Sequence, residues 1–138
     1  VGAAVQKRGS VETAYFSVTG TDDEVVPFVN ENNWRTNAFF CAWTAYQTMN
    51  GMEVSSRPDF SKDATFGIAL KDREVISTNK RVTMEAGVLY KGDIPLIKVV
   101  AVNDYGHWNF KPDARLMWDF MKQFSRDPRT KKLVYGKR

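Results

Sequence analysis

The sequence predicts an α/β fold in a single unit. Two short, apolar, β-branched segments, 13–19 and 96–102, are typical of buried strands in a largely parallel sheet. Two amphipathic segments, 36–49 and 112–124, are typical of helices. A hairpin is predicted between these halves, so the order is strand, helix, hairpin, strand, helix. The length of 138 residues and the 43% of hydrophobic residues suit one packed core.

The first half contains one predicted strand and one predicted helix. The strand ends at Gly20, and an acidic, asparagine-rich loop containing Pro27 leads to Asn33. The helix 36–49 is predicted because aromatic residues recur at helical spacing and Asn50 with the next glycine stops it. These aromatic residues are Phe39, Phe40, Trp43 and Tyr46.

The second half contains the predicted hairpin, strand and final helix. Between residues 64 and 89 short apolar runs are separated by polar pairs, which predicts two antiparallel strands. The strand 96–102 and a loop over 103–111 follow. Pro112 suits the first turn of a helix, and an apolar stripe continues from there, made of Leu116, Met117, Phe120, Met121 and Phe124.

The composition excludes several classes of protein. The net charge of +4 comes from cations that concentrate in the tail 126–138 and do not form a folded basic face, so we expect no nucleic-acid partner. The stretch 96–102 is interrupted by Lys98 and is too short to span a membrane. We expect a soluble chain with no membrane partner and no leader within it, cytoplasmic or secreted. A lone Cys41 excludes an internal disulfide.

Two loops that follow the predicted strands carry candidate catalytic groups. In open α/β sheets such groups gather beyond the carboxyl ends of the strands. The loop 20–27 contains acidic residues, and the loop 103–109 contains His107, the single histidine of the chain. A histidine can act as a general base near neutral pH, and a carboxylate can fix its tautomer. The alternative is a loop histidine that bonds to backbone groups.

Several other residues keep two interpretations. Asp22 and Asp104 compete with Asp23 as the partner of His107. Cys41 could act as a nucleophile, although a cysteine within an apolar helix is usually a small buried hydrophobe. Three aromatic residues are candidates for an acyl or aryl pocket or for simple packing: Trp34, Tyr105 and Trp108. One histidine and one cysteine do not make a metal site, so we expect no bound metal.

Two segments carry a resemblance to a known family. The segment 19–27, TGTDDEVVP, resembles the H-G-T-x-D-x-V-V-P stretch of α/β-hydrolases in the branch of polyhydroxybutyrate depolymerases and feruloyl esterases. The segment 106–108, GHW, resembles the G-G-H-T-W-P loop of that branch. The resemblance implies that Asp23 is the acid and His107 the base of a catalytic triad, which needs no cofactor. Thr19, Tyr105 and Asn109 depart from the family pattern.

The resemblance also implies what the chain is part of. The nucleophile sequence G-x-S-x-G is absent and the first residue is Val1, so we expect the C-terminal portion of a serine ester hydrolase, inactive alone. Its parts would be an acid strand and loop (13–33), an inserted helix and hairpin (34–95), a last strand with the histidine loop and helix (96–125), and a basic tail (126–138). Its expected partners are an ester substrate, small or polysaccharide-linked, the missing N-terminal half, and a second copy at the exposed sheet edge.

A different class of function stays open beside the hydrolase. A free-standing, non-catalytic binding module could use the same aromatic residues to hold a carbohydrate or a protein partner. His107 would then have no catalytic role.

Overall fold

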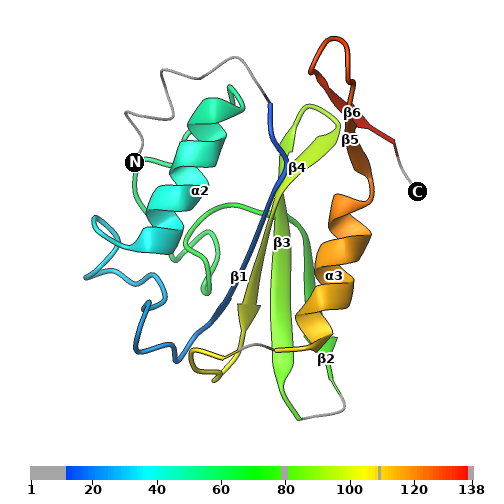
Figure 1. Cartoon of the computed structure of the whole chain (residues 1–138). Helices are drawn as coiled ribbons and strands as arrows, with labels where there is room; N and C mark the ends of the chain where they lie inside the picture. Colours follow the sequence, from blue (N-terminus) through cyan, green and yellow to red (C-terminus); the bar gives the residue numbers. More distant parts are fainter. Residues whose placement is uncertain (1–11, 79–80, 109, 137–138) are drawn as a thin grey trace.

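A computed structural model describes residues 12–78, 81–108 and 110–136 of the chain (Figure 1). The described part contains two helices and six strands. In chain order they are β1 (Tyr15–Gly20), α2 (Ala38–Met49), β2 (Lys71–Ser77), β3 (Thr83–Lys91), β4 (Ile94–Val102), α3 (Pro112–Met121), β5 (Phe124–Arg126) and β6 (Leu133–Tyr135).

The main sheet is mixed, with the strand order β1-β4-β3-β2. β1 runs parallel to β4, whereas β4 with β3 and β3 with β2 are antiparallel. The predicted fold class, a section of an α/β-hydrolase with a mostly parallel sheet and flanking helices, is therefore wrong. The reason lies in the connections: β3 reaches β4 through Gly92 and Asp93 alone, and a parallel pair needs a crossover of a dozen or more residues.

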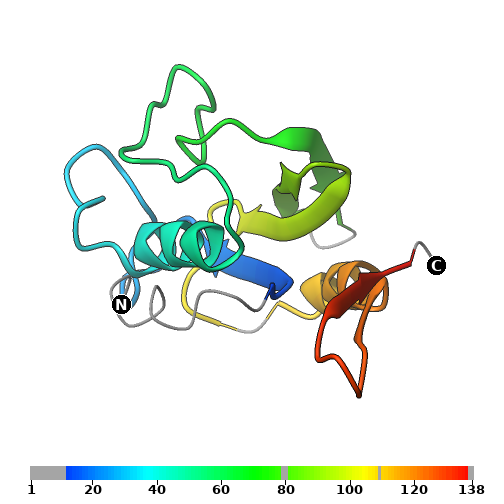
Figure 2. The ribbon, with the colours of Figure 1, turned by 90° about the horizontal axis from the view of Figure 1, so that it is seen from above.

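Each face of the sheet carries one helix, because the side chains of β4 alternate between two apolar clusters. Val99 and Ala101 belong to the cluster that contains Phe40 and Trp43 of α2. Val100 and Val102 belong to the cluster on the opposite face. There the ring of Phe16 lies 6.0 Å from that of Phe120 in α3. The two helices accordingly appear on opposite sides of β1 and β4 (Figures 1 and 2).

Two asparagines set the limits of α2. The side-chain oxygen of Asn37 accepts the backbone N–H groups of Phe39 and Phe40, so the helix begins at Ala38, two residues after the predicted start. It ends at Met49, as predicted. Asn50 is 1% exposed, and its amide pairs with both the N–H and the C=O of Thr13. This pairing ties the end of the helix to the start of β1.

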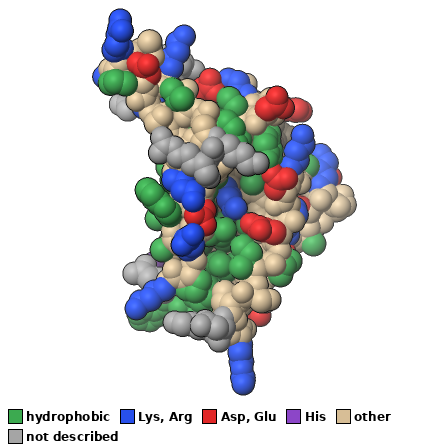
Figure 3. All heavy atoms as spheres, turned by 90° about the vertical axis from the view of Figure 1, so that its right-hand side faces the viewer, with side chains coloured by type: hydrophobic (Ala, Val, Ile, Leu, Met, Phe, Trp, Pro, Cys, Tyr) green, Lys and Arg blue, Asp and Glu red, His purple; other side chains and the backbone are tan. Residues whose placement is uncertain are grey.

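The end of the chain differs from its prediction in two ways. α3 begins at Pro112 as predicted but ends at Met121, and its apolar stripe buries Phe120 alone. Met117 is 46% and Met121 is 38% exposed. Hydrophobic side chains are visible between charged ones on this side of the molecule (Figure 3). The predicted basic tail contributes Arg126 and β6 to a small antiparallel hairpin with β5.

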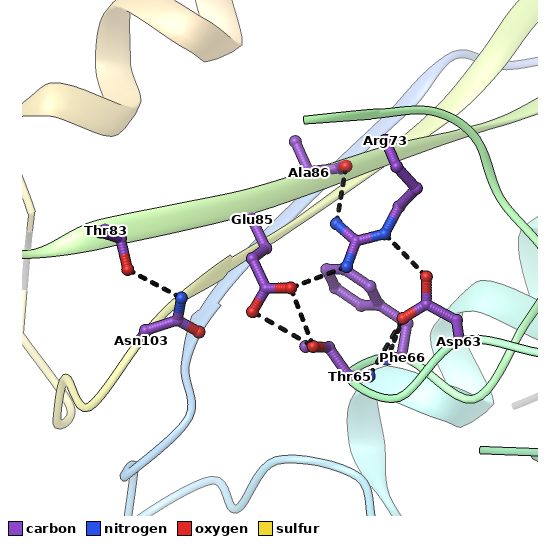
Figure 4. Close-up of polar contacts among 8 residues, drawn as sticks. All are labelled: Asp63, Thr65, Phe66, Arg73, Thr83, Glu85, Ala86 and Asn103. Atoms are coloured by element: carbon purple, nitrogen blue, oxygen red, sulfur yellow. Dashed lines mark hydrogen bonds and ion pairs between the residues drawn. The ribbon is translucent and has the colours of Figure 1, made fainter. Parts of the chain in front are cut away.

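Arg73 of β2 holds the preceding loop against β3 (Figure 4). Its guanidinium donates at 2.7 Å to Asp63, at 2.7 Å to Glu85 and at 2.9 Å to the carbonyl of Ala86. It also lies over the ring of Phe66, 5.1 Å from the centroid. Phe66 is 0% exposed, so this set of contacts closes the core over the sheet.

Among the described residues, no helix combines the length and the apolar character needed to cross a membrane.

Candidate functional site

The candidate site forms where β1 and β4 end side by side. The two strands are parallel neighbours, and the last residue of β1, Gly20, pairs with Val102 at the end of β4. The loops that follow them therefore leave from the same edge of the sheet. Thr21 donates its N–H to the carbonyl of Val102, and Asp22 donates to that of Tyr105, both at 3.0 Å. The two loops are thus joined along their backbones.

The histidine-bearing loop is also anchored at its start. Asn103 donates its backbone N–H to the carbonyl of Thr83 at 2.9 Å. Its amide donates to the Thr83 hydroxyl, also at 2.9 Å (Figure 4). Asp104 has a φ of +56°, and its N–H donates to the hydroxyl of Thr21 at 2.8 Å. β3 and the β1 loop together fix where the chain turns toward His107.

Asp23 and His107 are in direct contact. The Nδ1 atom of His107 lies 2.7 Å from Oδ2 of Asp23. The other carboxylate oxygen, Oδ1, accepts the backbone N–H groups of Val25 and Val26, each at 2.8 Å. Asp23 is buried at 8% exposure, whereas the side chain of His107 is 55% exposed. The carboxylate is thus held by its own loop on one side and presented to the imidazole on the other.

The surroundings of Asp23 favour its charged form. Burial alone would raise the pKa of Asp23, but hydrogen bonds from Val26, His107 and Val25 outweigh burial and lower the pKa. An ionised carboxylate has no proton to donate, so Nδ1 of the neutral imidazole must carry the proton in this contact. The second ring nitrogen, Nε2, then has a free lone pair, which is what a general base needs.

The structure distinguishes between the three candidate acids. Asp23 makes the contact with His107, which confirms the expected proximity of these two side chains. Asp22 and Asp104 are both exposed, and each contacts the neighbouring loop through its backbone N–H group. The catalytic role of the Asp23–His107 pair remains a prediction.

A pocket of about 380 Å³ lies beside the pair. Tyr105 and Trp108 both line it, as expected for an apolar wall. The ring of Tyr105 packs 5.0 Å from that of Phe110, while Trp108 is 83% exposed. Trp108 therefore offers an open indole surface at the pocket, and Tyr105 is the more closely packed of the two.

Trp34 does not take part in this pocket. Its ring packs edge-on to Phe40 at 5.8 Å, and the guanidinium of Arg35 lies over it, 4.6 Å from the centroid. Trp34 instead lines a separate hollow next to the loop 56–62. Of the three aromatic candidates, the structure brings two to His107 and leaves Trp34 in a packing role.

Two further lining residues were missed by the sequence analysis. Phe39 reaches the pocket from α2, and Asp113 reaches it from the first turn of α3. Burial raises the pKa of Asp113 above its usual range. The sequence signal that could have indicated these two residues is their position, because each lies near the start of the helix that follows one of the two loops. That signal is weak because it does not say which way a side chain points.

No described residue that lines the pocket is a serine or a cysteine. Thr19 is the described lining residue with an aliphatic hydroxyl, and it is 6% exposed with its oxygen 3.5 Å from the carbonyl of Gly20. Cys41 is a free, half-buried thiol whose Sγ lies 3.8 Å from the carbonyl of Arg35. It does not line the pocket, so the structure does not pair Cys41 with His107.

The described residues contain no group of three or more histidine, cysteine, aspartate or glutamate side chains that could hold a metal ion.

No family model, curated protein or solved structure matches the chain. The chemistry assigned to the site rests on the contacts of Asp23 and His107 and on the lining of the pocket.

Proposed function

We propose that this chain supplies the acid and the base of a serine ester hydrolase. The observation that carries the proposal is the 2.7 Å contact between Nδ1 of His107 and the buried carboxylate of Asp23. A carboxylate on Nδ1 orients the ring, selects the tautomer with a free Nε2 and stabilises the imidazolium that forms during proton transfer. The resemblance of the segments 19–27 and 106–108 to esterase motifs supports the same assignment.

Each residue would perform a defined step. Nε2 of His107 accepts the proton of a serine hydroxyl as that oxygen attacks the ester carbonyl, and the imidazolium then donates the proton to the departing alcohol. Water, activated by the same nitrogen, hydrolyses the acyl-serine and releases the acid. Asp23 remains ionised throughout. No described serine lines the pocket, so the nucleophile must come from polypeptide outside this part of the chain.

Tyr105 and Trp108 would hold the apolar portion of the ester. Both line the pocket next to His107, and aromatic side chains supply the apolar area that small-molecule sites use. The exposed indole of Trp108 would bind an acyl or aryl group by partial burial. The polar lining of Asp23 and His107 would lie at the reacting centre.

The test uses the protein encoded by the whole gene that contains this chain. It should hydrolyse p-nitrophenyl esters and react with a serine-directed fluorophosphonate, whereas the 138-residue chain alone should do neither. His107→Ala and Asp23→Asn should each lower kcat by about 10³-fold or more. Asp104→Asn is the matched control, because this carboxylate lies in the same loop as His107 and does not contact it. Full turnover in His107→Ala would refute the proposal.

A second candidate function is a non-catalytic binding module. The observation that favours it is Trp108, which is 83% exposed on a pocket whose described lining has no serine or cysteine. An exposed indole is a common platform for sugar rings. Titration with soluble oligosaccharides should then quench tryptophan fluorescence, and Trp108→Ala should abolish the quenching. Absence of saturable binding in the wild-type chain would exclude this candidate.

A further inference from the structure

We infer that Gly20 is a positioning residue for His107. Its lack of a side chain allows the histidine-bearing loop to lie directly against the end of β1, and this close approach brings the imidazole to Asp23. The inference deepens the proposed function, since it concerns how the same pair is assembled. The inference depends on the contact between His107 and Asp23, and this contact exists whatever reaction the two residues serve.

The steric argument rests on backbone atoms. A Cβ atom at Gly20 would lie 2.1 Å from the carbonyl oxygen of Tyr105 and 2.7 Å from that of Gly106. Real Cβ contacts do not occur at such distances, and backbone atoms cannot move aside by a change of rotamer. Gly20 is the last residue of β1 and is paired with Val102, so the sheet holds Gly20 in place and the displacement falls on the loop. Any side chain at position 20 must therefore push the segment 105–106 away from the strand.

The consequence for His107 follows from its place in the chain. Tyr105 and Gly106 are the two residues that precede it, so a displacement of their carbonyls carries the imidazole with them. Asp23 is held in its own loop, where its Oδ1 accepts the N–H groups of Val25 and Val26, and the bond from the Asp22 N–H to the Tyr105 carbonyl has to break as the two loops separate. A contact of 2.7 Å cannot absorb a shift of about 1 Å and remain a good hydrogen bond.

Gly106 offers a matched control within the same loop. A Cβ atom there would meet Trp108 Cδ1 at 3.7 Å, which is an ordinary van der Waals contact. Gly20 and Gly106 thus differ in the feature that the inference concerns, the space beside the backbone. Gly136, where a Cβ atom has nothing within 4 Å, provides a second control far from the site.

The experiment measures the contact directly in the 138-residue chain. His107 is its single histidine, so ¹⁵N spectra of the labelled imidazole report one ring. At a pH where the ring is neutral, the wild-type protein should carry its proton on Nδ1, and Gly106→Ala and Gly136→Ala should do the same. Gly20→Ala should lose this preference and show a mixture of the two tautomers. The pKa of the Asp23 carboxyl should also rise toward its ordinary value in Gly20→Ala, because the hydrogen bond from His107 is lost.

Each remaining outcome overturns the inference. If Gly20→Ala folds and keeps the proton on Nδ1 with an unchanged Asp23 titration, Gly20 does not position the histidine. If circular dichroism shows that Gly20→Ala does not fold while Gly106→Ala does, Gly20 is needed for the sheet to form and its role is not the positioning of the histidine loop. Neither readout needs ester hydrolysis, so a failure of the proposed function would leave the tautomer result interpretable.

Discussion

Nδ1 of His107 lies 2.7 Å from Oδ2 of Asp23, although 84 residues separate them in the sequence. The contact exists because β1 and β4 are parallel neighbours, which places the loops at their carboxyl ends side by side. The intervening residues form α2, the antiparallel β2–β3 pair and β4 itself. A pair of strands is therefore the structural unit of the site.

The tautomer of His107 is predicted to depend on Asp23. In Asp23→Asn an amide N–H replaces a carboxylate oxygen and can donate to Nδ1, which moves the imidazole proton to Nε2. The ¹⁵N shifts of the two ring nitrogens should exchange their assignments between the wild-type protein and this variant. Asp104→Asn should leave them as in the wild type. Identical ring spectra in Asp23→Asn would mean that the contact is not maintained in solution.

The carboxyls of Asp23 and Asp113 are predicted to titrate on opposite sides of the ordinary value of 3.8. The pKa of Asp23 is lowered, so its stabilising contribution is present above 3.8 and is lost as the pH falls through the lower pKa of the folded state. The pKa of Asp113 is raised by burial, so its contribution is present at low pH and is lost as the pH rises from 3.8 through the folded value.

Carboxyl ¹³C spectra over a pH series measure both midpoints in one experiment. Thermal unfolding of Asp23→Asn should show a weaker fall in stability at acid pH than the wild-type protein. Equal midpoints for the two carboxyls would contradict the burial and the hydrogen bonds described for them.

Loss of the Arg73 side chain is predicted to destabilise the fold by about 2 kcal/mol. The carboxylates of Asp63 and Glu85 have side-chain exposures of 8% and 19%, and Arg73→Met would leave both without their cation. Arg73→Lys should recover only part of the lost stability, because the ammonium keeps the positive charge but cannot reproduce the forked contacts of the guanidinium. Urea unfolding measures the difference. Arg115→Met is the control: Arg115 is 81% exposed in its ion pair, so its loss should cost under about 0.5 kcal/mol.

The open edge of β1 is predicted to associate with a second copy of the chain. Among the described residues β1 pairs with β4 on one side alone, which leaves a row of backbone groups free for strand addition. Sedimentation velocity over a concentration series should therefore show a growing fraction of dimer. Trp118→Lys is the control that distinguishes association through this edge from association through the apolar side of α3, where Trp118 is 62% exposed. A strictly monomeric wild-type chain, or dimerisation abolished by Trp118→Lys, would contradict association through the edge.

The sequence by itself determined the features that depend on neighbouring residues. α2 ends at Met49 and α3 begins at Pro112 as predicted, because a glycine stop and a proline start act within one turn. The buried strand 96–102 lies within β4, and the segment 64–89 contains the predicted antiparallel pair in part. The candidate acid and base were also named from the sequence, because both lie in loops that follow apolar strands and in segments that resemble esterase motifs.

The tertiary structure alone decided how these elements combine. Strand direction depends on which strands pair, and the two-residue turn at Gly92–Asp93 makes β4 antiparallel to β3, where the sequence analysis expected a mostly parallel sheet. Hydrophobic spacing in α3 marks an apolar side but does not say whether anything covers it, and Met117 remains 46% exposed. The sequence left Asp22 and Asp104 as competitors of Asp23, and the register of β1 against β4 decided which carboxylate contacts the imidazole, because pairing between distant strands sets that distance.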